Sequence, residues 1–182
     1  MLSGPVLDRL IATFDGCPYG TTAGRRHRKP GRPALYTAEE RARRDATSWT
    51  PVQGILAPVQ FVVFLVSLAL VLNYLASGEG LYAAEASIVV KTLTLYTIMI
   101  TGCVWEHKVF GRWLFAPAFF WEDVFSILVL ALHTGYLVAL AADFGGTQFQ
   151  MWLALAAYAA YVINAGQFLL KLRMARLEAA RA

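Results

Sequence analysis

Five side chains that can exchange protons lie in or beside long apolar stretches of this 182-residue sequence. Carboxyl groups and imidazoles are the groups that enzymes use most often for general acid–base catalysis. On insertion scales, a charged residue at the centre of a membrane-spanning helix costs about 2.5–3.5 kcal/mol, and such residues usually face the interior of a helix bundle. The candidate groups are Glu106, His107, Glu122, Asp123 and His133.

Glu122 and His133 share one helical face, because Glu122, Ser126, Val129 and His133 follow one another at helical spacing. A helix rises 1.5 Å per residue, so Glu122 and His133 are about 16 Å apart, too far for a hydrogen bond. They could instead contact two parts of one large ligand. A simpler role stays open for each. Glu122 and Asp123 would complement a helix dipole, and His133 would hydrogen-bond to a neighbouring helix.

Two other apolar stretches also carry polar side chains. Lys91 lies near one end of its stretch, and we expect its ammonium group to extend to the nearer membrane surface. Asn164 and Gln167 lie three residues apart and either link helices or contact a substrate. Lys171 follows one turn later, and we expect it to anchor its helix at the membrane surface.

Aromatic side chains crowd the segment 105–123, which also holds four of the candidate acid–base groups. Such a rim suits a flat, amphiphilic, aromatic ligand, and it also fits an ordinary aromatic belt at a membrane surface. The side chains that we expect to bind a substrate are His133, Trp105, Trp121, Asn164 and Gln167.

The overall composition excludes a water-soluble domain. Hydrophobic residues make up 58% of the chain and charged residues 15%, against roughly 45–50% and 25% in an average soluble domain. The mean hydropathy is +0.51. The chain lacks the charge to cover its surface in water, and it is too apolar to be disordered throughout. Lipid must therefore cover much of it.

Four apolar segments of about 20 residues predict four membrane-spanning helices, because only a helix pairs its own backbone groups within lipid. The expected fold class is an all-α integral membrane protein. The spans are predicted at about 54–76, 84–105, 118–142 and 149–170, within a domain at 51–172. The flanking elements are a disordered basic tail at 1–35, an amphipathic surface helix at 36–50 with a capping box at Thr37 and Glu40, and a basic tail at 173–182.

Positive charge gathers near the two chain ends. Of the 16 Lys and Arg residues, nine precede residue 50 and four follow residue 170. A loop expected at 106–117 carries two more, whereas the other two loops carry none. By the positive-inside rule, both termini face the cytoplasm. The two cysteines, Cys17 and Cys103, form no metal motif, and we do not expect them to pair.

Several runs of the chain resemble the vinyl (bacterio)chlorophyllide hydratase family of bacteriochlorophyll biosynthesis. The resemblance covers roughly residues 34–177, and the tail 1–33 lies outside it. The runs that carry it are LYTAEERARRDAT at 35–47, VQGILAPVQF at 52–61, FAPAFFWEDVFS at 115–126, ALHT at 131–134 and AAYAAYVINAGQF at 156–168.

This resemblance implies a reaction and a setting. Water adds across the C3-vinyl group of chlorophyllide a or 3-vinyl-bacteriochlorophyllide a, and the product is the 3-(1-hydroxyethyl) pigment. No cofactor is needed, and magnesium enters only as part of the pigment. The implied setting is the inner or intracytoplasmic membrane of a photosynthetic bacterium. Expected partners are the pigment and lipid, with other enzymes of the pathway and a second copy of the chain left open, and no nucleic acid.

The chemistry of hydration requires a general acid, a group that holds water, and surroundings that tolerate positive charge. Our hypothesis makes Glu122 the general acid and Asp123 the group that positions water. His133 ligates the pigment magnesium or relays protons, and Glu106 or His107 assists at the rim.

Two other classes of function compete with this interpretation. A non-enzymatic tetrapyrrole carrier or photosystem assembly factor would use the same aromatic rim and His133 but would need no acid. A small proton-coupled transporter would use Lys91, Glu122 and His133 as a relay. Four short spans without broken helices argue against transport unless the protein is oligomeric.

Overall fold

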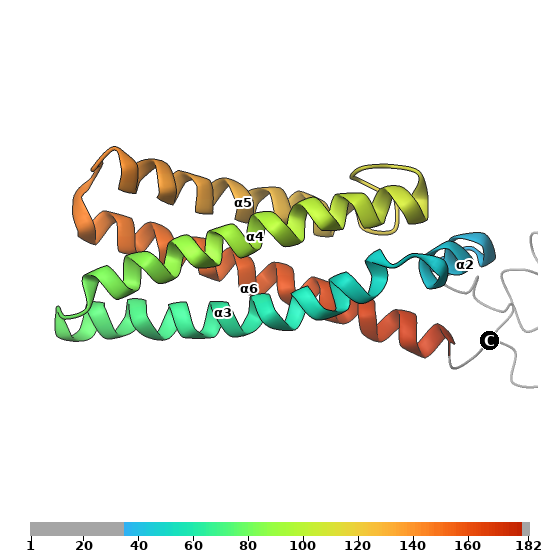
Figure 1. Cartoon of the computed structure of the whole chain (residues 1–182), viewed down its shortest axis with the longest axis horizontal. Coiled ribbons are helices and arrows are strands. Elements are labelled where there is room, and N and C mark those ends of the chain that lie inside the picture. Colours follow the sequence, from blue (N-terminus) through green and yellow to red (C-terminus); the bar gives the residue numbers. More distant parts are fainter. Residues whose placement is uncertain (1–34, 180–182) are drawn as a thin grey trace, which may run out of the picture. The chain divides into compact units, whose positions relative to one another are not determined.

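The structure, a computed structural model, describes residues 35–179, and within that range the chain forms five α-helices and no strand (Figure 1). The helices are α2 (Ala38–Ala46), α3 (Trp49–Ser77), α4 (Leu81–Phe110), α5 (Phe120–Ala141) and α6 (Gly146–Ala179). Helices α3 to α6 are long and apolar enough to cross a membrane. The all-α class and the four predicted spans are therefore confirmed. The tail predicted at 1–35 lies outside the described residues, except for Leu35.

The four long helices run alternately up and down, and α3 packs along α4 as α5 packs along α6 (Figure 1). One end of the bundle holds α2, the loop 111–119 and the last turns of α6. We call it the α2 end. The opposite end holds the turns at 78–80 and 142–145, and we call it the far end.

Helix α2 begins at the predicted capping box. The backbone N–H of Glu40 donates to Thr37 Oγ1 at 3.2 Å, and the N–H of Thr37 donates to Glu40 Oε2 at 2.8 Å. Arg43 Nε donates to the carbonyl of Val109 at 2.7 Å, so α2 is attached to the last turn of α4. The position of α2 on a membrane surface stays a prediction.

Helix α4 is longer than the sequence predicts. It continues through Glu106 and His107 to Phe110, so the loop expected at 106–117 begins only at Gly111. Gly111 ends the helix in the left-handed conformation, with φ of 73°, which glycine adopts without a steric penalty. The extension matters for the site, because it fixes Glu106 and His107 on a rigid element.

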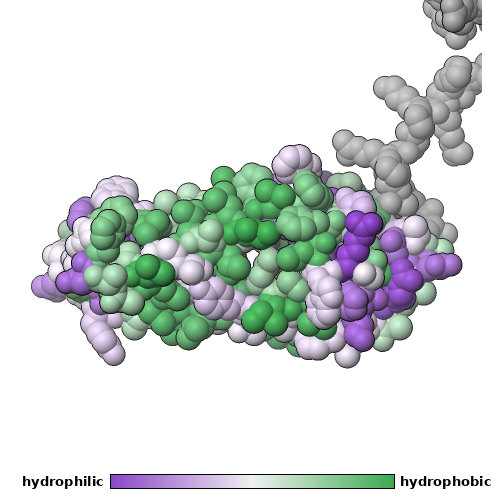
Figure 2. Space-filling model, turned by 90° about the horizontal axis from the view of Figure 1, so that it is seen from above, coloured by the Kyte–Doolittle hydropathy of each residue, from purple (hydrophilic) through white to green (hydrophobic). Residues whose placement is uncertain are grey.

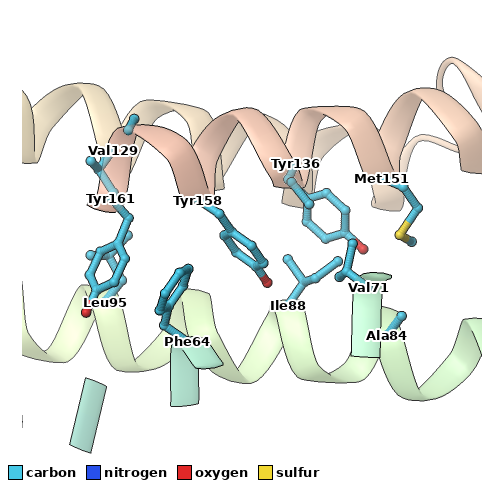
Figure 3. Close-up of a cluster of buried hydrophobic side chains, with 12 residues drawn as sticks. Phe64, Val71, Ala84, Ile88, Leu95, Val129, Tyr136, Met151, Tyr158 and Tyr161 are labelled. Carbon is cyan, nitrogen blue, oxygen red and sulfur yellow. The ribbon is translucent and has the colours of Figure 1, made fainter. Parts of the chain in front are cut away.

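The interior of the bundle is built mainly from aromatic and aliphatic side chains (Figure 3). Phe64 of α3 packs edge-on against Tyr158 of α6, with ring centroids 5.5 Å apart. The centroids of the Phe64 and Tyr161 rings are 4.9 Å apart. Most other large apolar side chains face outward, and Figure 2 shows them as a hydrophobic band between two hydrophilic ends. This is the distribution expected of a bundle that lipid surrounds.

Candidate active site

Glu106 and Asp123 form a buried pair of carboxyl groups at the α2 end. Glu106 comes from the last turns of α4 and Asp123 from the first turn of α5. Their side chains are hydrogen-bond partners, and the two residues are only 4% and 6% exposed. Two carboxyl groups can hydrogen-bond only through a proton that one of them keeps. The pair is therefore suited to hold and donate a proton.

The loop 111–119 closes over this pair. The N–H of Ala116 donates to Glu106 Oε1 at 2.5 Å, and the N–H of Phe115 donates to Asp123 Oδ2 at 2.8 Å. Phe115 has a positive φ of 61°, a strained conformation for a residue with a Cβ. The N–H groups of Phe115 and Ala116 thus bind one carboxyl group each, and the Phe115 N–H belongs to a strained residue.

Glu122 has a different partner. Its Oε1 lies 3.5 Å from Lys171 Nζ, which also donates to the carbonyl of Ala118. The other oxygen, Oε2, is buried and has no hydrogen-bond partner among the residues that the structure describes. The expectation that Lys171 anchors its helix at the membrane surface stays a prediction, and its ammonium group pairs with Glu122. Glu122 therefore contacts a lysine, whereas Asp123 beside it contacts Glu106 and the backbone N–H of Phe115.

Two polar residues of α6, Asn164 and Gln167, lie near Glu122 of α5. The Asn164 amide donates to the carbonyl of Glu122 and to Ser126 Oγ, both at 3.0 Å. This is the link between helices that was one of its two predicted roles. Gln167 lies between Asn164 and Lys171 on the same face of α6, and its buried Oε1 has no partner.

The aromatic side chains of the rim divide into two groups. Trp105 is partly buried, donates to Thr50 Oγ1 at 2.9 Å and packs edge-on against Phe119. His107 stacks on Trp113 with ring centroids 4.3 Å apart and planes 4° from parallel. Trp121, by contrast, is 66% exposed. Trp105 therefore packs inside the fold, whereas Trp121 lies on the surface.

His133 is fully buried and lies apart from the carboxyl groups. Ten helical steps separate it from Asp123, about 15 Å along α5. Its Nδ1 lies 2.8 Å from the carbonyl of Val129, while its Nε2 has no partner. A carbonyl oxygen can only accept, so Nδ1 carries the proton and the neutral ring keeps a lone pair on Nε2.

Sequence reasoning misjudged Lys91 and missed two other buried polar side chains. The expectation that the Lys91 ammonium group reaches the membrane surface is wrong. Lys91 is 0% exposed, and Nζ lies 3.8 Å from the centroid of the Tyr161 ring. Gln60 and Tyr136 are also buried, and their side chains leave polar atoms without a partner among residues 35–177. The signal was present, since Gln60 and Lys91 are polar residues inside apolar stretches.

Two other features offer less to a reaction. Within residues 35–179, no three His, Cys, Asp or Glu side chains are grouped as a metal site requires. The absence of a cofactor stays a prediction. A groove of about 320 Å³ lies between α3 and α4, but it is lined by aliphatic side chains and by Ser87, whose hydroxyl group bonds to Ser67.

Comparison with known proteins identifies relatives over nearly the whole described chain. The family model for 2-vinyl bacteriochlorophyllide hydratase matches residues 36–174. A protein of that name from Cereibacter sphaeroides is 70% identical over 146 residues, which are 79% of this chain and 89% of the relative. Another of that name, from Rhodobacter capsulatus, is 67% identical over 153 residues, 83% and 88% of the two chains. No solved structure matches.

Proposed function

The chain belongs to the 2-vinyl bacteriochlorophyllide hydratase family, and we propose that it hydrates the vinyl group of chlorophyllide a or 3-vinyl-bacteriochlorophyllide a. The enzyme is a hydro-lyase of bacteriochlorophyll biosynthesis. The single observation that carries the mechanism is the pair of hydrogen-bonded carboxyl groups, Glu106 and Asp123, beneath the loop 111–119. This pair is a better general acid than Glu122, because Glu122 is engaged in an ion pair.

The reaction needs one proton and one water molecule. The Glu106–Asp123 pair donates its proton to the terminal carbon of the vinyl group, which leaves a cation delocalised into the macrocycle. Water attacks the inner carbon and releases a proton, which returns to the pair. The product is the 1-hydroxyethyl group, and the enzyme is regenerated. Once the pair has lost its proton, its negative charge stabilises the cation, and the N–H groups of Phe115 and Ala116 stabilise that charge.

Glu122 and Gln167 are placed to hold the water. Glu122 Oε2 and Gln167 Oε1 are both acceptors without a partner in the bundle interior. A water molecule that donates one hydrogen to each acceptor keeps a lone pair for attack. Asn164 and Lys171 fix this arrangement by binding the backbone and the side chain of Glu122. Asp123 therefore shares the acid role, and Glu122 takes the water-holding role.

His133 is suited to ligate the magnesium of the pigment. Ligating histidines commonly donate their second ring N–H to a carbonyl or carboxylate, which fixes the tautomer. His133 has this arrangement, with Nδ1 on Val129 and a free lone pair on Nε2. The magnesium is part of the substrate. About 15 Å along α5 separates His133 from Asp123. The two side chains, together with the half of the macrocycle that carries the vinyl group, would span this distance.

Exposed aromatic side chains beside the loop would receive the pigment. Trp113 and Phe115 of the loop, and Phe120 and Trp121 at the start of α5, are between 37% and 66% exposed. His107, stacked on Trp113, would orient that ring toward the pigment. We propose that the macrocycle first stacks on these rings and that the loop then moves to admit the vinyl group.

The α2 end is proposed to face the cytoplasm. Arg43, Lys108, Arg112 and Lys171 are at this end, whereas the far end carries Glu79 and neither of its turns contains Lys or Arg. Positive charge favours the cytoplasmic side, and α2 would then lie on the inner surface of a photosynthetic membrane. Other enzymes of the pathway, or a second copy of the chain, would approach the same side.

Turnover of the pigment tests the proposal. We would incubate purified Glu106→Gln with chlorophyllide a and record the red absorption band, which moves to shorter wavelength when the vinyl conjugation is lost. Removing a general acid lowers the rate about 10²- to 10⁴-fold. Glu79→Gln, the same substitution at an exposed far-end position, should turn over normally. A wild-type protein that binds the pigment and returns it unchanged would identify a carrier instead.

A further inference from the structure

The centre of the bundle contains buried polar atoms that nothing in the described chain satisfies. The amide of Gln60, the ammonium group of Lys91, Nε2 of His133 and the hydroxyl group of Tyr136 have no hydrogen-bond partner, and all four residues are at most 3% exposed. Figure 3 shows the Tyr136 hydroxyl beside the apolar side chains of Ile88 and Val71. Native proteins rarely leave several such groups together without a ligand or water.

Lys91 is the most costly of these groups. Within residues 35–177, no carboxylate lies within ion-pair distance of Nζ, since the ion pairs there are Arg44–Asp45 and Lys171–Glu122. The face of the Tyr161 ring, 3.8 Å away, supplies only a weak cation–π attraction. An ammonium group buried in a membrane bundle normally has a negatively charged partner. The missing partner is therefore an anion that residues 35–177 do not provide.

We propose that Lys91 binds the propionate carboxylate of the pigment substrate. This inference rests on the proposed function, because a chlorophyllide carries its propionate as a free acid and so brings one negative charge into the bundle. The vinyl and propionate groups are attached to different pyrrole rings. One pigment can therefore present its vinyl group to the α2 end and its carboxylate to Lys91.

The positions of the contacting residues agree with such a pose. Tyr161, which covers Lys91, lies three residues from Asn164, about 4.5 Å along α6. His133 packs against the Tyr158 ring, with ring centroids 5.9 Å apart, and Tyr158 lies one turn from Tyr161 on α6. Lys91 and the proposed magnesium ligand thus contact adjacent turns of α6, and both contacts lie on the far-end side of Asn164. Lys91 would then fix which edge of the macrocycle faces the acid.

The propionate methyl ester of the pigment provides the test. It has the same macrocycle, vinyl group and magnesium but lacks the charge. Removing one partner of a buried charge pair weakens binding about 30-fold or more. For the wild-type enzyme in detergent, we expect kcat/KM for chlorophyllide a to exceed that for its methyl ester by at least about tenfold. In Lys91→Met this preference should disappear, while turnover of the ester persists. Lys108→Met, an exposed lysine, should retain it.

Two results would overturn the proposal. Equal kcat/KM for acid and ester in the wild-type enzyme contradicts it, and this comparison needs no variant to fold. A preference for the acid that survives in Lys91→Met, with the ester still turned over, also contradicts it. Pigment binding, followed by the shift of the absorption band on addition of protein, gives the same comparison without catalysis. It therefore separates failure of the Lys91 site from failure of the hydratase mechanism.

Discussion

The two polar regions of the bundle differ in how their side chains are satisfied. At the α2 end, Glu106 and Asp123 accept backbone N–H groups, and Glu122 pairs with Lys171. In the centre, the side chains of Gln60 and Lys91 have no hydrogen-bond partner within residues 35–177. Groups whose hydrogen bonds are made within the fold are held in place by it. Unpartnered buried groups, which at the α2 end include Glu122 Oε2 and Gln167 Oε1, cost stability and indicate a site that binds something. The carboxyl pair that would donate the proton is thus held by the fold, whereas the groups that would hold water or substrate lack partners among the described residues.

Loss of both carboxyl groups should have the largest effect. In the proposed mechanism Glu106 and Asp123 share one proton and act as a unit, and effects of such residues are far from additive. We expect Glu106→Gln, Asp123→Asn and the double variant each to lower kcat about 10²- to 10⁴-fold, with the double variant no worse than the slower single one. Initial rates with chlorophyllide a measure this. Multiplication of the two single effects would mean that the residues act separately.

Substitution of Lys171 should have the next largest effect, and this effect is on stability. Lys171→Met leaves the Glu122 carboxylate buried without its partner, which we expect to cost about 2–3 kcal/mol, discounted because the lysine side chain is 24% exposed. Unfolding by sodium dodecyl sulfate in mixed micelles measures the loss. Adding Glu122→Gln to Lys171→Met should restore part of it. No recovery in the double variant would show that the ion pair does not contribute.

A pair of substitutions contrasts the two regions directly. Asn164→Leu removes the amide that links α6 to Glu122 and Ser126, and it should lower the free energy of unfolding by about 1–2 kcal/mol. Gln60→Leu removes an unsatisfied polar group and should raise the same free energy by about 1 kcal/mol. The unfolding titration compares both with the wild type. Destabilisation by Gln60→Leu in the pigment-free protein would mean that the centre is already satisfied.

Strain at Phe115 should give the smallest effect. Its φ of 61° suits glycine and disfavours β-branched residues. Phe115→Gly and Phe115→Val both remove the ring, so their difference isolates the backbone. We expect the valine variant to be less stable than the glycine variant by about 1 kcal/mol. Equal stability would show that the loop does not keep this conformation.

The sequence predicted the four helices well because the apolar segments are long and the bilayer sets their length. It identified Glu106, Glu122 and Asp123 for the same reason, since charged residues in such segments are conspicuous. It did not predict which carboxyl groups meet. That depends on the extension of α4 to Phe110 and on the two N–H groups of the loop, which carry no side-chain signal.

The direction in which a lysine side chain points was the other property that the sequence did not predict. A lysine near the end of an apolar segment can extend to the membrane surface or turn inward, and spacing alone does not distinguish the two. Lys91 turns inward against the Tyr161 ring, and Lys171 pairs with Glu122 of α5. Such contacts join residues far apart in sequence, so only the folded bundle defines them.

Infrared spectroscopy tests the central claim most directly, because it detects a protonated carboxyl group by its C=O stretch. The account predicts this band in the wild-type protein at neutral pH, with the small downshift in ²H₂O that marks an exchangeable proton. The band should be absent from the double variant Glu106→Gln, Asp123→Asn and retained in Glu79→Gln. A wild-type spectrum without the band, or a double variant that keeps it, would contradict the claim that Glu106 and Asp123 hold the proton that the vinyl group receives.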